Sequence, residues 1–176
     1  MKILAFAATN SSRSINLALA RYAASLVEGA IVDTLDLNDF EMPIFSEDRE
    51  KKIGHPSEAK VFLEKIAQAD ALIIAFAEHN GNFTAAYKNL FDWCSRVNRE
   101  VYQNKPTLIL STSPGARGGI SVLELALDSL PRFSADVKAS LSVPSYYQNL
   151  NLEQGPIVSE DINDKLFDAL KLLLGY

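Results

Sequence analysis

Five short apolar runs alternate with segments of helical period along the chain. The apolar runs predict strands, which are Lys2 to Ala7, Ile31 to Leu35, Ala71 to Phe76, Thr107 to Ser111 and Ala135 to Leu141. Three of these runs are almost continuously apolar, which is typical of strands covered on both faces. Apolar residues spaced by three and four predict the helices. Their stripes are Ala20, Ala23 and Val27; Ala59, Phe62, Leu63 and Ile66; Ala86, Leu90, Trp93, Cys94 and Val97; and Ile162, Leu166, Ala169, Leu170 and Leu173.

The alternation of strand and helix predicts an α/β fold, with a parallel sheet and helices on both of its faces. A further helix is expected before the fifth strand, because Ser121 and Glu124 have the spacing of a capping box and Pro131 marks an end. Two connections are long, 36–56 and 142–158. Long connections are often functional, so we expect these two to form walls of a site.

Composition and charge narrow the class of protein. The 176 residues are 48% hydrophobic and 22% charged, which favours a single globular domain over residues 1–176. The net charge of -5 argues against a nucleic-acid partner. The amino terminus is apolar for too few residues to form a signal peptide or a membrane span. With Cys94 as the one cysteine, we expect a cytoplasmic protein without a disulfide and without a membrane partner.

Polar residues gather where the first, third and fourth strands end, at the edge where open parallel sheets bind ligands. In the first of these loops, residues 8–16, six side chains carry hydroxyls or amides, Arg13 is cationic, and a helix follows at once. The free N–H groups of a helix start favour an anion such as a phosphate. The same residues fit an ordinary helix cap at Ser12 or Ser14 equally well.

The other two loops contain glycines next to helix starts. Gly81, in the loop Glu78 to Asn82, permits a positive φ or close approach of the backbone to a flat ligand, and Asn82 or Thr84 would cap the next helix. The sequence holds two histidines, His55 and His79, too few for a metal cluster. The third loop, 111–119, contains three glycines and is either a plain turn or a seat for a planar ring.

Taken together, the three loops resemble the NADPH-dependent FMN reductase family, the flavodoxin-like group that includes quinone, chromate and azo-dye reductases. That family reads approximately G-S-x-R-x-x-S-x-N, then P-E-Y-N-G-S with K-N-x-x-D-W, then S-P-G-x-x-G-G. The counterparts here are 8–16, then 77–82 with 88–93, then 113–119. The resemblance implies a flavodoxin-like three-layer sandwich whose five-stranded parallel sheet has the order 2-1-3-4-5.

The resemblance also implies which residues bind FMN. Those expected at the phosphate are Thr9, Ser11, Arg13, Ser14, Ile15 and Asn16, and those expected along the isoalloxazine are Ala77, Glu78, His79, Asn80, Gly81, Ser113 and Gly115. Ser11 stands where the family has arginine, and Arg13 follows two residues later. His79 replaces the family's tyrosine. Lys88, Asn89, Asp92 and Trp93 are expected to be structural or to serve a subunit contact.

The activity implied is that of an FMN-dependent NAD(P)H oxidoreductase, with NADPH or NADH as co-substrate and no catalytic side chain. The acceptor would be a quinone, an azo compound, a metal oxyanion or free flavin, and the assembly a homodimer or homotetramer. An alternative is a flavodoxin-type electron carrier. The phosphate loop of that class reads T/S-x-T-G-x-T, and residues 9–14 do not match it. A phosphoacceptor signalling module needs clustered carboxylates at these strand ends, where Glu78 stands alone.

Overall fold

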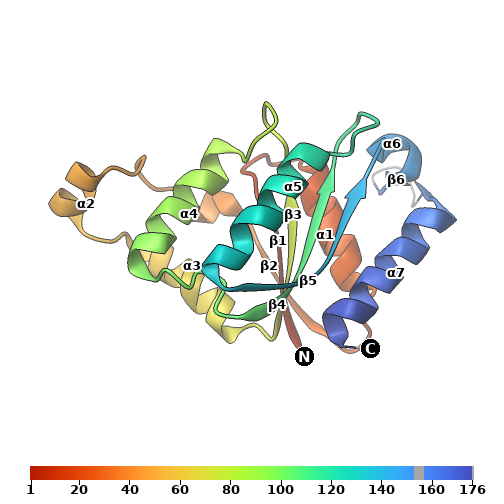
Figure 1. The fold of residues 1–176 in the computed structure, drawn as a ribbon, viewed down its shortest axis with the longest axis horizontal. Coiled ribbons are helices and arrows are strands. Elements are labelled where there is room, and N and C mark those ends of the chain that lie inside the picture. Colours follow the sequence, from red (N-terminus) through yellow and green to blue (C-terminus); the bar gives the residue numbers. More distant parts are fainter. Residues whose placement is uncertain (153–156, 176) are drawn as a thin grey trace.

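The computed structural model describes residues 1–152 and 157–175 and contains a five-stranded parallel sheet (Figure 1). The strands lie in the order β2-β1-β3-β4-β5, as predicted. They are β1 (Lys2–Ala7), β2 (Ile31–Leu35), β3 (Ala71–Phe76), β4 (Lys105–Thr112) and β5 (Ala135–Val143). β4 extends beyond its predicted bounds at both ends, and β5 continues for two more residues.

Helices cover both faces of the sheet and make it the middle of three layers (Figure 1). On one face lie α1 (Ile15–Ser25) and α7 (Glu160–Leu174). On the other lie α3 (Ser57–Gln68), α4 (Ala85–Val97) and α5 (Ile120–Ser129). The flavodoxin-like three-layer sandwich is therefore confirmed.

β3 shows why the central strands read as unbroken apolar runs. Successive side chains of a strand point to opposite faces of the sheet. Leu72, Ile74 and Phe76 accordingly pack into the apolar cluster under α3, α4 and α5. The residues between them, Ala71, Ile73 and Ala75, pack into the cluster under α1 and α7. Because both faces are covered, no position of β3 is left for a polar residue, and all six are buried.

The two long connections carry short elements of their own. After β2 come a 3₁₀ helix, η1 (Leu37–Phe40), and α2 (Glu47–Ile53), which buries no side chain and projects beyond α4 (Figure 1). A second 3₁₀ helix, η2 (Leu130–Phe133), follows α5. After β5 come α6 (Tyr146–Asn149) and the antiparallel pair β6 (Leu150–Asn151) and β7 (Ile157–Val158). Residues 153–156 of this predicted wall lie outside the described residues.

The residues at the helix starts confirm two of the predicted caps and contradict a third. Ser14 caps α1 through the Leu17 N–H, and Thr84 caps α4. The capping box at Ser121 and Glu124 is wrong, because α5 begins at Ile120, directly after Gly119. Gly119 has φ +75°, a conformation that glycine adopts without strain, and it turns the chain into the helix earlier than the box spacing implies.

Candidate functional site

The loops after β1, β3 and β4 lie together at the carboxyl edge of the sheet (Figure 1). Their strands are neighbours and end nearly level, since Ala7 pairs with Ala75 and Phe76 pairs with Ser111. The segments that contain the predicted site residues are thus adjacent in space. We call residues 8–16 the first loop, 77–84 the second and 113–119 the third.

The first loop is tied to the other two by buried side chains. Thr84 donates its hydroxyl to the Ala8 carbonyl at 2.9 Å while capping α4, and so joins the second loop to the first. The side-chain amide of Asn16 bonds both backbone groups of Thr112, donating to the carbonyl at 3.1 Å and accepting from the N–H at 2.9 Å. This pair joins the start of α1 to the strand end that precedes the third loop.

The second and third loops are tied by Glu78. One of its carboxylate oxygens accepts the Val122 N–H at 3.1 Å, within the first turn of α5. The N-cap of that helix, Gly119, supplies no side-chain acceptor. The carboxylate therefore acts as a cap supplied from another loop, and its negative charge lies at the positive end of the helix dipole. Hydrogen bonds thus join the first loop to the second directly, and join both of them to the strand end and the helix that flank the third.

The first loop presents donors that suit a phosphate. Ser11 donates its N–H to the Thr9 hydroxyl at 3.2 Å, whereas the N–H groups of residues 12–16 donate to no other described residue. Arg13 is exposed, and no hydrogen bond or ion pair joins its side chain to another described residue. Unused N–H groups at a helix start beside a guanidinium form an anion site, so this loop fits the phosphate of FMN.

The second loop presents its backbone in a tight turn. Asn80 and Gly81 have φ of +54° and +74°, and His79 and Asn82 exchange backbone hydrogen bonds of 3.0 and 3.1 Å around them. All four residues are exposed, and a Cβ at Gly81 would meet nothing within 4 Å. Gly81 thus takes the positive φ that was one of the two expectations for it, and the turn geometry accounts for that conformation.

The third loop is braced by the chain that follows β5. The Ser113 and Gly115 carbonyls accept the N–H groups of Tyr146 and Ser145 at 3.1 and 3.0 Å. A Cβ at Gly118 would overlap the Ser142 hydroxyl, so only glycine fits there. The Ser113 hydroxyl also donates to the Gly115 carbonyl at 3.2 Å, so the carbonyls of both residues and the Ser113 side chain are used internally.

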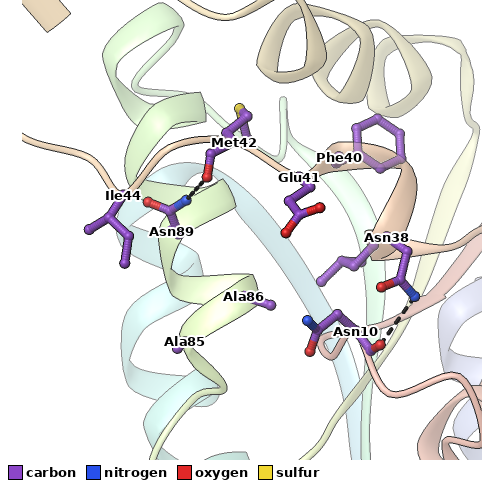
Figure 2. Close-up of a pocket in the computed structure, with 10 residues that line it drawn as sticks. Asn10, Asn38, Phe40, Glu41, Met42, Ile44, Ala85, Ala86 and Asn89 are labelled. Carbon is purple, nitrogen blue, oxygen red and sulfur yellow. Dashed lines mark hydrogen bonds between the residues drawn. The ribbon is translucent and has the colours of Figure 1, made fainter. Parts of the chain in front are cut away.

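A cavity of about 230 Å³ opens between the first loop, the segment after β2 and the start of α4 (Figure 2). It is lined by Asn10, Leu37, Asn38, Phe40, Glu41, Met42, Ile44, Ala85, Ala86 and Asn89. The sequence singled out the 36–56 connection as a wall, and residues 37–44 do line this cavity. Asn10 stands at a variable position of the first-loop motif and the two alanines lie outside the quoted motifs, so the sequence did not indicate that they line a cavity.

α4 holds the cavity wall in place. Asn89 accepts the Phe45 N–H at 2.9 Å and donates to the Met42 carbonyl at 3.0 Å, and Trp93 donates its indole N–H to Pro43 at 2.7 Å. The structural role expected of Asn89 and Trp93 agrees with these contacts. Lys88 and Asp92 form an ion pair on the exposed side of the same helix.

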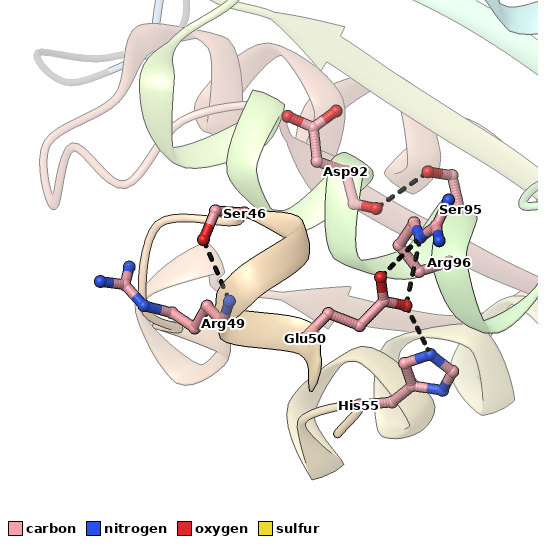
Figure 3. A network of polar contacts seen from close by, with 7 residues as sticks. All are labelled: Ser46, Arg49, Glu50, His55, Asp92, Ser95 and Arg96. Carbon is pink, nitrogen blue, oxygen red and sulfur yellow. Dashed lines mark hydrogen bonds and ion pairs between the residues drawn. The ribbon is translucent and has the colours of Figure 1, made fainter. Parts of the chain in front are cut away.

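An ion-pair network fastens α2 to α4 (Figure 3). Glu50 accepts two hydrogen bonds of 3.1 Å from Arg96 and lies 3.0 Å from the His55 ring nitrogen. The Arg96 guanidinium lowers the pKa of the Glu50 carboxyl, with a smaller contribution from His55. The network lies outside the loops, and its effect is to hold the projecting segment against the body.

Neither a reactive thiol nor a metal-binding cluster is present among the described residues. Cys94 is fully buried, and burial raises the pKa of its thiol to about 12, so it stays protonated and packs as an apolar side chain. Among the described residues, no group of three His, Cys, Asp or Glu side chains is placed to hold a metal ion. Nor does that part of the chain contain a helix long and apolar enough to cross a membrane.

Comparison with known proteins decides the family. A family model described as NADPH-dependent FMN reductase matches residues 1–147. The chain belongs to this family. An NAD(P)H-dependent FMN reductase of Pseudomonas aeruginosa is 33% identical over 119 residues, covering 67% of this chain and 63% of that protein. An NADPH:quinone oxidoreductase of Arabidopsis thaliana is 30% identical over 129 residues, covering 71% and 64%. The matches thus span less than two thirds of each relative.

Solved structures of a flavoenzyme oxidoreductase and of a flavodoxin have the same fold. A flavoenzyme NAD(P)H:(acceptor) oxidoreductase from Paracoccus denitrificans superposes with a TM-score of 0.76 at 19% identity, covering 98% of this chain and 94% of that one. A flavodoxin from Pseudomonas aeruginosa gives 0.59 at 14% identity, covering 99% and 100%. At these identities the likeness concerns the fold alone.

Proposed function

We propose that this family member binds FMN across its three tied loops and works as an FMN-dependent NAD(P)H oxidoreductase for small acceptors. The observation that carries the proposal is the set of unused donors in the first loop, held beside two further loops at the carboxyl edge of the sheet. Family membership supports it, as do the activities named for the relatives. FMN bound there would take a hydride from NAD(P)H and pass the electrons to the acceptor.

In this proposal the first loop holds the phosphate. Thr9, Ser11 and Ser14 place hydroxyls there, Ile15 and Asn16 supply backbone N–H groups, and Arg13 takes the part of the family arginine that Ser11 replaces. The side chain of Asn16 is occupied by Thr112, so it positions the loop instead of touching the ligand. The remaining predicted residues, Ala77, Glu78, His79, Asn80, Gly81, Ser113 and Gly115, border the ring through the second and third loops.

The ties between loops prepare the site before the cofactor enters. A binding site built on fixed loops loses little conformational entropy on binding, which favours affinity. Thr84 and Asn16 are buried and anchor the first loop from two sides. The chain's own contribution is thus to bind and orient the ring, without a nucleophile or general base.

The proposal also covers the electron acceptor, the cellular compartment and the assembly of the enzyme. Quinones and azo compounds are the acceptor classes that we favour, in line with the names of relatives and structural neighbours. We propose that residues 1–176 act as one FMN-binding domain in the cytoplasm and assemble as a homodimer or homotetramer. α2 supports an oligomer, since none of its residues is buried in the single chain.

Steady-state NADPH oxidation tests the function and separates it from the electron-carrier alternative. The FMN-loaded protein should consume NADPH continuously when a small quinone is added, with no partner reductase present. With oxygen excluded, so that quinone is the sole electron acceptor, omission of FMN or of quinone should abolish that consumption. A protein that retains FMN but oxidises NADPH no faster than free FMN at the same concentration would be a carrier and not this enzyme.

A further inference from the structure

Asn80 and Gly81 form an exposed turn at the tip of the second loop. Figure 1 shows this loop, between β3 and α4, standing clear of the neighbouring helices. Both residues are exposed and have positive φ, and a Cβ built at Gly81 meets nothing within 4 Å. The turn is closed by the two backbone hydrogen bonds between His79 and Asn82. Packing therefore leaves Asn80 and Gly81 open to solvent and to each other.

An asparagine followed by glycine can form a succinimide ring, because glycine has no side chain to shield its backbone nitrogen. The Gly81 nitrogen would give up its proton to base and bond to Cγ of Asn80. The bond from Cγ to the side-chain nitrogen then breaks, and that nitrogen leaves as ammonia. Water opens the ring at either carbonyl and gives aspartate or isoaspartate. The conversion consumes water alone and needs no oxidant or reductant.

Hydrogen bonding distinguishes Asn80 from other exposed asparagines. The sequence holds one Asn-Gly pair, and neither the Gly81 N–H nor the Asn80 side-chain amide bonds to another described residue. Asn104 is also exposed and has φ +56°. However, the N–H of the next residue, Lys105, donates to the Tyr102 carbonyl at 2.9 Å. The attacking nitrogen is thus uncommitted after Asn80 and occupied after Asn104.

We propose that Asn80 is a site of spontaneous deamidation and that FMN bound across the three loops protects it. The protection rests on the proposed function, in which the isoalloxazine borders the second loop. A ring seated on that loop would restrict the turn and shield the Gly81 nitrogen from base. The unliganded protein would then lose its cofactor site as it ages, and bound FMN would preserve that site.

Conversion changes both the charge and the backbone of the second loop. Aspartate adds a carboxylate beside Glu78, and isoaspartate also lengthens the main chain by one carbon within a tight turn. Because FMN carries a negative phosphate, Asn80→Asp should weaken its binding about threefold to fivefold, the scale of an exposed charge interaction. The isoaspartate form should bind FMN more weakly than Asn80→Asp. Asn104→Asp, just before β4 at the opposite end of the sheet, is the matched control and should leave FMN affinity unchanged.

Peptide mapping by mass spectrometry tests the site. Protein with and without FMN is incubated in warm, mildly alkaline buffer, and digests are analysed at intervals. Without FMN, Asn80 should convert more slowly than in a free peptide of residues 77–84, because the turn must open, while Asn104 stays unconverted. With FMN at about ten times its Kd, conversion should slow about tenfold, since only the unliganded fraction reacts. Labelling by isoaspartyl methyltransferase identifies the isoaspartate product.

A substitution at Gly81 tests the chemistry separately from the cofactor. Gly81→Asn introduces a residue that tolerates positive φ but places a side chain beside the attacking nitrogen. Conversion at Asn80 should therefore be slower in this variant than in the parent when both lack FMN. An equal rate in the two proteins would show that the Gly81 nitrogen does not close the ring.

The outcomes separate this inference from the function beneath it. If Asn80 stays intact without FMN, or converts no faster than Asn104, the modification site is refuted whatever the protein does with FMN. If retained FMN leaves the rate unchanged, the protection is refuted and the oxidoreductase function stands. If FMN is not retained, that function and the protection are both refuted, while the unliganded protein still decides the modification. Loss of FMN binding in step with conversion, slowed by FMN, supports the inference.

Discussion

The side-chain amide of Asn16 and the backbone of Thr112 form a closed pair of hydrogen bonds, 3.1 and 2.9 Å long. The two residues are 96 positions apart in the chain, and both are buried. One belongs to the first turn of α1 and the other ends β4. The contact therefore fixes the start of the helix that offers N–H groups to a phosphate relative to the third loop.

Replacing Asn16 should destabilise the fold and the site together. Asn16→Ala leaves a buried N–H and a buried carbonyl of Thr112 without partners, at a cost of about 1–3 kcal/mol for each group. We expect the unfolding free energy in urea to fall by about 2 kcal/mol or more, and FMN affinity to fall with it. Asn10→Ala, at an exposed position of the same loop, should leave stability unchanged. Equal unfolding free energies for Asn16→Ala and Asn10→Ala would show that the hydrogen bonds between Asn16 and Thr112 do not stabilise the fold.

Glu78 is predicted to stabilise α5 from outside that helix. Glu78→Ala removes the acceptor for the Val122 N–H and should cost about 1 kcal/mol, as loss of an N-cap does. Glu78→Gln keeps an acceptor but loses the charge at the helix dipole, so a smaller loss is expected. Amide hydrogen exchange should quicken in the first turn of α5. Glu124→Gln, exposed on the same helix, is the control, and exchange that quickens equally there would count against the cap.

Arg13 is predicted to strengthen the binding of the FMN phosphate and to contribute nothing to the binding of the rest of the ligand. Arg13→Ala removes a charge-assisted donor, which is worth about 1.5–3 kcal/mol, so FMN should bind at least about tenfold more weakly. Riboflavin, which lacks the phosphate, should bind the variant within about twofold of the parent. Arg21→Ala on the exposed side of α1 should affect neither ligand. Equal losses for FMN and riboflavin would show that Arg13 does not contact the phosphate.

The Glu50–Arg96 pair should make stability depend on acid pH. Because Arg96 lowers the pKa of Glu50 in the folded protein, the unfolded chain takes up a proton first as the pH falls below about 4.5, its ordinary value. The stabilisation is therefore present above that pH and is lost as the pH falls through the folded pKa. Melting temperatures from pH 7 to 3 should converge for the parent and Glu50→Gln at the acid end. Glu28 is exposed and remote from the pair, so the melting temperature of Glu28→Gln should change with pH in parallel with that of the parent.

Local patterns were enough to predict the strands, most of the helices and a parallel sheet covered on both faces, whereas the strand order came from the resemblance to a family. Strands such as β3 are apolar throughout because both faces are buried, and this leaves a visible signature in the sequence. The apolar stripes of the helices were likewise predicted from the spacing of their residues. The capping box predicted at Ser121 and Glu124 is wrong although the two residues have the required spacing, because the backbone of Gly119 starts the helix earlier.

Contacts between distant residues could not be predicted from spacing. Glu78 contacts Val122 across 44 positions and Glu50 contacts Arg96 across 46, so nothing in the sequence next to either glutamate indicates its partner. The cavity is assembled from three segments that are separate in the sequence, and nothing in any one of them indicates that they meet. Resemblance to a family supplied the ligand, while only the structure shows how its loops are held.

The central claim is that the three loops form one site for FMN. The most direct measurement is an absorbance spectrum of the protein, incubated with FMN and passed through a desalting column, before and after anaerobic addition of NADPH. The account predicts a yellow protein with about one FMN per chain whose visible band is bleached by NADPH. A colourless protein after desalting, or bound FMN that NADPH does not bleach, would contradict it.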